Sequence, residues 1–142
     1  MDQLSQESGI VNWMGPTATG QGDVVPATRI DMRGFDRLTI LIRVGAIAAG
    51  GIVAAFLRHA ATDVAGVKTT LTKALGAADD NELIVLEVRD PVLRFLDLVI
   101  ERTVGDSDIV SILALQHRAS GPMPIAQAAG INVASAVRPA TA

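Results

Sequence analysis

Apolar and polar residues alternate with a period of two through the middle of the chain, as in β-strands that bury one face. In residues 37–44 every even-numbered position is apolar, and Leu41 is the one apolar residue at an odd-numbered position. Similar segments recur along the chain, separated by stretches rich in glycine, aspartate and proline, which favour turns. This pattern predicts strands at residues 28–33, 37–44, 52–60, 67–75, 82–89, 94–103 and 109–118.

The number and spacing of these segments predict an all-β fold. We expect a single β-sandwich of about seven or eight strands with an immunoglobulin-like or jelly-roll-like topology. One segment leaves an alternative open, because the alanines of residues 51–65 would also suit a short helix. The alternation predicts that Ile40, Ile42, Leu98, Ile100 and Leu113 are buried, and that Arg43, Asp97 and Glu101 point outward.

The two ends of the chain are apolar, almost uncharged and without alternation. Residues 1–22 contain two charged side chains, and residues 121–142 contain one. A disordered tail is normally rich in charge and poor in large apolar side chains. We therefore expect a sandwich domain at residues 23–120 with an extended arm at each end of the chain, and we expect these N- and C-terminal arms to lie on a partner or a neighbouring copy. The alternative is that they close over their own domain. The arm residues expected to bind the partner are Ile10, Val11, Trp13, Met14, Ile125, Ile131, Val133 and Val137.

The composition excludes several classes of function. The chain has 142 residues, no cysteine and a net charge of −3. It therefore has no disulfide or thiolate metal site, and its scattered basic residues form no electrostatic footprint for nucleic acid. Its longest apolar run, residues 44–57, is too short to span a membrane. Since no nucleophile or phosphate loop stands in a recognisable motif, we expect a protein that is not an enzyme and binds no cofactor, nucleic acid or membrane.

Histidines and acidic turns are the remaining candidates for a metal site. His59 and His117 each stand beside an arginine, without a carboxylate or second histidine at ligand spacing, so we expect solvated or interface positions for both. Residues 79–82 and 106–108 carry enough carboxylates to hold calcium in principle. Neither segment has the glycine and terminal glutamate of a dedicated calcium loop, and solvated turns are the simpler interpretation. No metal site is therefore predicted.

The order of segments between residues 28 and 124 resembles that of small structural proteins of tailed phages. A charged stretch leads into an apolar strand and a glycine-rich turn, and an Asp-Pro turn later connects two further strands. The segments that carry the resemblance are, in order, residues 29–36, 44–47 and 50–51, the strand at residues 83–88, Asp90-Pro91, the strands at residues 94–101 and 109–116, and Arg118 with Pro122-Met123-Pro124 behind it.

The resemblance implies a capsid decoration, or cement, protein or a minor head protein. Such a protein binds the outer surface of the major capsid protein shell, stabilises the head and belongs to the virion after synthesis in the host cytoplasm. A homo-oligomer is also expected because apolar residues are abundant for a chain of this size, with a trimer favoured over a dimer. Two alternatives remain open. One is a ring component of the head–tail connector or tail-completion complex, and the other is a carbohydrate- or host-binding module, which usually exposes more aromatic residues than this chain contains.

Overall fold

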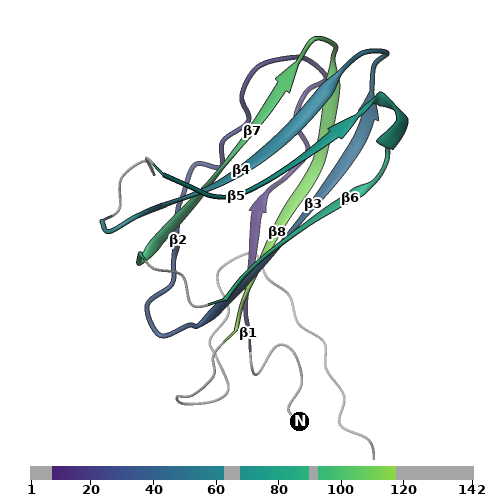
Figure 1. Ribbon diagram of the computed structural model, residues 1–142. Helices are drawn as coiled ribbons and strands as arrows, with labels where there is room; N and C mark the ends of the chain where they lie inside the picture. Colours follow the sequence, from purple (N-terminus) through teal and green to yellow (C-terminus); the bar gives the residue numbers. More distant parts are fainter. Residues whose placement is uncertain (1–7, 63–67, 90–92, 118–142) are drawn as a thin grey trace, which may run out of the picture.

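Eight β-strands in two antiparallel sheets make up most of the part of the chain that the computed structural model describes, residues 8–62, 68–89 and 93–117 (Figure 1). Sheet A has the strand order β1-β8-β3-β6, and sheet B has the order β2-β7-β4-β5. The chain changes sheet at every step except β4 to β5, which is the winding of a jelly roll. The predicted β-sandwich is therefore confirmed. The strands are β1 (Ser8–Met14), β2 (Ile30–Asp31), β3 (Arg37–Ile47), β4 (Ile52–Ala60), β5 (Lys68–Gly76), β6 (Leu83–Arg89), β7 (Phe95–Thr103) and β8 (Ser107–His117), and a 3₁₀ turn, η1 (Ala77–Asp79), precedes β6.

Every strand predicted from the sequence has a counterpart in the structure, including the one at residues 52–60, although one predicted strand is much shorter. The segment that could have been a helix is strand β4, whose alternate residues Val53, Ala55 and Leu57 are buried. The strand predicted at residues 28–33 is reduced to the two residues of β2, because the chain turns where Phe35 N donates a hydrogen bond to Met32 O at 3.0 Å. Within the described ranges, no helix is long and apolar enough to cross a membrane.

Strand β3 is longer than predicted and ends in a tight turn. It continues through the small residues after Val44, because Ile47 still pairs with Ser107 of β8. The turn to β4 is therefore short. A Cβ atom on Gly51 would lie 2.9 Å from the Ala48 carbonyl oxygen and from Ile47 Cγ2, so the turn requires glycine at this position.

The core lies between the sheets and is built from one face of each strand. As predicted, Ile40, Ile42, Leu98 and Ile100 are completely buried, and Arg43 and Glu101 are exposed. Asp97 differs from the prediction. The alternation of β7 places it on the outer face of sheet B, yet it is 4% exposed, because Arg58 of the neighbouring strand pairs with it.

A β-bulge changes the inward face of β8. Ser111 pairs with Arg43, whereas Ile109 pairs with the next residue of β3, Val44, so β8 contains one extra residue here. Ile109 faces the core before the bulge, and even-numbered residues such as Ile112 face it afterwards. The prediction that Leu113 is a core residue is therefore wrong. Leu113 lies half-buried on the outer face of sheet A.

The N-terminal segment is part of the sandwich. Strand β1 pairs with β8 from Ser8, opposite His117, to Met14, opposite Ile112. The alternation is not visible in the sequence because the register shifts between Asn12 and Met14. The predicted arm at residues 1–22 is therefore wrong from residue 8 onward, and the sandwich begins before residue 23. The remaining predicted arm residues, 1–7 and 121–142, lie outside the described residues.

An arginine holds the chain after β1 against the sandwich. The guanidinium of Arg102 donates hydrogen bonds of 2.9–3.2 Å to the carbonyl oxygens of Ala18, Gln21, Gly22 and Ser107. Because one guanidinium carries five N–H donors, it satisfies carbonyls that a loop could not pair by itself. This segment is therefore fixed against β8 of sheet A at Gly20 and against β7 of sheet B at Gly22 and Val24.

Candidate interaction surface

The four apolar residues predicted for the N-terminal arm lie in β1. Val11, Trp13 and Met14 pack against the core of their own sandwich. Trp13 is buried, and its Nε1 donates a hydrogen bond to the carbonyl oxygen of Thr28 at 2.7 Å. These three residues therefore do not form a free arm, because the bulge in β1 turns both Trp13 and Met14 inward. Ile10 lies on the outer face of sheet A. The other predicted partner-binding residues, Ile125, Ile131, Val133 and Val137, lie outside the described residues.

The outer face of sheet A carries a continuous group of apolar side chains from all four strands. Leu41 at its centre stands opposite Leu113 of β8 on one side and Val85 of β6 on the other. In the next row, Ile10 of β1 stands opposite Leu115 of β8. The group, which we call the apolar face, consists of Ile10, Leu41, Leu83, Val85, Leu113 and Leu115.

The apolar face has no second layer of described residues over it, because sheet B packs against the opposite side of sheet A (Figure 1). An antiparallel sheet that meets water normally presents polar residues on that side. Leu83 and Val85 of the edge strand are well exposed, and Leu41 is half-buried by its neighbours. The sequence carried a signal of this surface. Leu41 interrupts the alternation of β3, and residues 83–86 of β6 are apolar on both faces.

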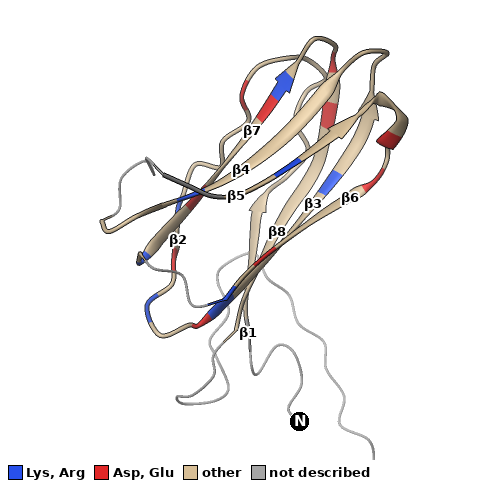
Figure 2. Cartoon of the chain, viewed as in Figure 1, with Lys and Arg blue, Asp and Glu red and all other residues tan. Residues whose placement is uncertain are grey.

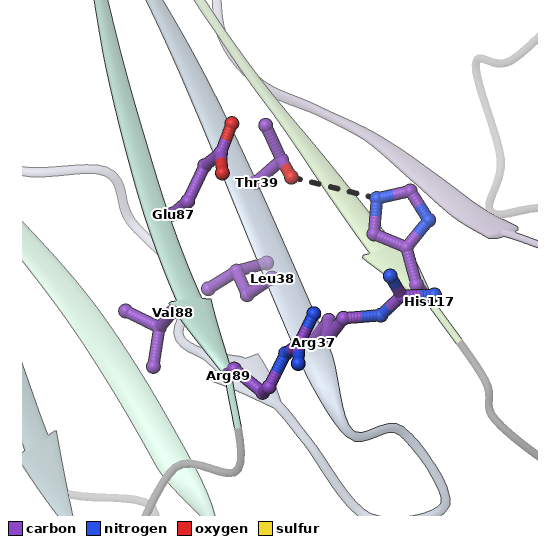
Figure 3. Close-up of a pocket in the computed structure, with 7 residues that line it drawn as sticks. All are labelled: Arg37, Leu38, Thr39, Glu87, Val88, Arg89 and His117. Carbon is purple, nitrogen blue, oxygen red and sulfur yellow. Dashed lines mark hydrogen bonds between the residues drawn. The ribbon is translucent and has the colours of Figure 1, made fainter.

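Basic side chains cross sheet A in one row at the end of the apolar face. Arg37 of β3 pairs with Arg89 of β6 and with His117 of β8. Together with Thr39, Glu87 and two apolar residues, they line a hollow of about 410 Å³ (Figure 3). Two guanidinium groups beside one hollow suit a carboxylate or another anion, since each can donate two parallel hydrogen bonds. The sequence did not reveal this row, because its members come from three strands that meet only in the fold.

The opposite end of the same face is acidic. Asp108 of β8 lies on the outer side of the sheet beside Gly45, whose hypothetical Cβ would be 3.0 Å from the Asp108 Cβ. Asp80 and Glu82 are exposed on the turn that leads into β6, the end of this strand farthest from Arg89 (Figure 2). The face therefore has an apolar centre between a basic and an acidic border, and it also carries Arg43 opposite Leu83 and Glu87 opposite Thr39.

The acidic turns have structural roles in the described part of the chain. Asp79 Oδ2 accepts a hydrogen bond of 3.0 Å from the backbone N of Gly76 and so closes the 3₁₀ turn. Asp108 accepts a hydrogen bond from the Thr19 hydroxyl and so holds the segment after β1. Across the described residues, no three His, Asp or Glu side chains lie close enough together to hold a metal ion.

The two histidines occupy different environments. His59 follows Leu57 in the inward alternation of β4 and is buried, so the expectation of a solvated or interface position is wrong for it. His117 is half-buried on the outer face of sheet A, where its Nε2 lies 3.5 Å from the Thr39 hydroxyl (Figure 3). Of the two, His117 is therefore the one that a partner can contact.

No family model matches the chain, and no curated protein matches it. Among solved structures, the TNF Eiger of S. frugiperda is similar over 86% of this chain and 98% of that chain, with a TM-score of 0.41 and 10% sequence identity. The strand order of the two sheets defines the fold of this chain as a jelly roll.

Proposed function

We propose that this chain is a phage capsid decoration, or cement, protein that binds the outer surface of the major capsid protein shell, stabilises the head and catalyses no reaction. The observation that carries the proposal is the apolar outer face of sheet A. A sandwich with Leu83 and Val85 exposed on an edge strand suits a subunit that works by contact with other proteins. The resemblance of residues 28–124 to small tailed-phage structural proteins supports the choice of a phage head.

Many copies on one shell allow such a role even if each single contact is weak. A subunit that binds once per capsomer and also binds its own copies gains strength from each contact, because the second contact forms at a high effective concentration. The jelly roll supplies a rigid body for this purpose. Residues 121–142, with Ile125, Ile131, Val133 and Val137, remain our proposed additional contact with the shell.

The proposal is tested with empty heads assembled without this chain. The purified protein is mixed with the heads, which are sedimented, and the bound copies are counted from the ratio of the two proteins. We expect saturation near one or more copies per capsomer, and a higher melting temperature of the decorated heads. A control without residues 121–142 should keep its own melting temperature and bind more weakly.

Two results would contradict the proposal. Failure to sediment with the heads would exclude decoration. Saturation at the few copies of a ring at one vertex would favour the head–tail connector or tail-completion alternative. The carbohydrate-binding alternative gains nothing from Trp13, because a sugar stacks on exposed aromatic rings and this indole is buried in the core.

A further inference from the structure

We propose that the apolar face of sheet A is the surface through which two copies of this chain associate, face to face and with their strands antiparallel. This assignment deepens the proposed function and rests on it: copies of the subunit meet through the apolar face, and the shell is bound by other surfaces, such as residues 121–142. It concerns the protein in the absence of a capsid. It can therefore fail or succeed separately from the binding of heads.

The first argument is the continuity of the apolar face across the sheet. Leu113, Leu41 and Val85 form one cross-strand row, so three adjacent strands contribute to a single contact area. Ile10 and Leu115 extend the area toward the basic border, and Leu83 extends it toward the acidic border. Two such faces can pack like the two sheets within a sandwich, whose facing side chains interdigitate.

The second argument is the charge of the two borders, which identifies a second copy as the occupant. The basic row of Arg37, Arg89 and His117 lies at one end of the face. Asp108 and Glu82 lie at the other end, and two further charges lie within the face, Glu87 next to the basic row and Arg43 next to the acidic border. If two copies meet face to face about a twofold axis through the centre, the basic row of each lies over the acidic border of its partner.

The same charges argue against a parallel arrangement. In the trimer that we expected from the sequence, a threefold axis along the strands would bring three basic rows together at one end. Like charges held close together oppose association. The antiparallel pair also buries Leu41 and Leu113 at the centre of the contact, because the twofold axis would run along their cross-strand row, between the two copies.

The experiment measures the mass of the purified full-length chain by sedimentation and by light scattering. We expect two copies at micromolar concentrations. Val85→Glu places a charge in the cross-strand row of Leu41, on the edge strand β6 and at a position 47% exposed in the single chain, where folding should tolerate it. This variant should dissociate at a concentration at least about tenfold higher, because the carboxylate would have to be buried in the contact.

The matched control is Ile52→Glu, the same kind of change at a position 42% exposed on sheet B. It should leave the association unchanged. Higher salt should weaken association of the unaltered protein, because the opposed borders attract each other through charge. A monomeric wild type, a trimeric mass, or an equal effect of the two glutamate variants would each overturn the proposal.

A second measurement covers the case in which Val85→Glu does not fold. The chain has no cysteine, so a single thiol reports its own position. Val85→Cys is a change of little volume. In a concentrated, associated sample its thiol should be alkylated at least about tenfold more slowly than in a dilute sample, because a packed contact excludes the reagent. In Ile52→Cys the rate should be independent of protein concentration. Equal rates at residue 85 in dilute and concentrated samples would overturn the assignment.

Discussion

Arg58 and Asp97 form a two-point ion pair across strands β4 and β7, with Nε–Oδ1 and Nη2–Oδ2 distances of 3.0 and 2.9 Å. The Asp97 side chain is 5% exposed and that of Arg58 is 28% exposed, so the carboxylate is the more deeply buried partner. Both residues stand at the same register position in the middle of sheet B. The pair therefore links two central strands on the side of the sheet away from the core.

Loss of Arg58 should cost more than loss of its partner. Arg58→Ala removes the two charge-assisted hydrogen bonds that the buried carboxylate accepts from Arg58 and should lower the free energy of unfolding by about 3 kcal/mol. Asp97→Ala leaves a partly solvated guanidinium and should cost about 1–2 kcal/mol. Urea unfolding of both variants, with Glu101→Gln as the exposed control on β7, tests the order. Equal losses would contradict the difference in burial.

The core prediction concerns Ile42 and Leu98, both completely buried. Replacing either with alanine should cost about 2–5 kcal/mol, because the lost burial is accompanied by a cavity. Arg43→Ala, one residue along β3 and exposed, should change stability far less. Thermal unfolding of the three variants is the measurement. A loss for Arg43→Ala as large as for Ile42→Ala would be incompatible with the register of β3.

Trp13 should be a folding residue. Trp13→Ala removes a buried indole and the hydrogen bond to Thr28 O, and should cost about 3–5 kcal/mol. Trp13→Phe retains most of the packing and should cost about 1–2 kcal/mol, mainly through the unpaired carbonyl. The melting temperatures of the two variants separate packing from hydrogen bonding. Unchanged melting of Trp13→Ala would restore the idea of a free N-terminal arm.

Val104 occupies a conformation that β-branched residues disfavour. Its φ is 70°, in the left-handed region, and it is 70% exposed in the turn between β7 and β8. Val104→Gly should stabilise the protein by about 1 kcal/mol, because glycine adopts this conformation without the clash of a side chain. Val25→Gly, a change at another exposed valine, should not stabilise. Denaturant midpoints of the two variants give the comparison, and a loss for Val104→Gly would contradict the strain.

Acid should weaken the contact between β2 and β7. Arg94 donates hydrogen bonds of 2.7–2.8 Å to both carboxylate oxygens of Asp31, which lowers the pKa of Asp31 below its ordinary value of 3.8. The folded state therefore holds this proton less tightly than the unfolded state. The stabilisation is present above pH 3.8 and is lost as the pH falls through the lowered pKa.

The contribution of this ion pair to stability should be small because both side chains are exposed. It is therefore measured as a difference in melting temperature between two proteins. Melting temperatures of the wild type and Asp31→Asn are compared from about pH 2 to pH 7. The wild type should be slightly more stable at neutral pH, and the two curves should converge in acid. A difference in melting temperature that is the same at all pH values would show that the carboxylate charge does not contribute to the stability difference.

The sandwich and most of its strands could be predicted from the sequence, because alternation is a local property. The even-numbered residues of β3 are apolar, and the fold buries Ile40 and Ile42 as that pattern predicts. A strand with one buried face needs no information about its neighbours to be recognised. The turns before β4, β6 and β8 were visible for the same reason.

Tertiary structure decided whatever depends on how strands pair. The bulge in β8 puts Leu113 on the outer face, and the shift in β1 turns Trp13 and Met14 into the core. The apolar face and the row of Arg37, Arg89 and His117 arise only when strands distant in the sequence lie in register. Hydrophobic patterning along one strand determines which residues are favoured for burial, whereas pairing between strands determines which of them share a face.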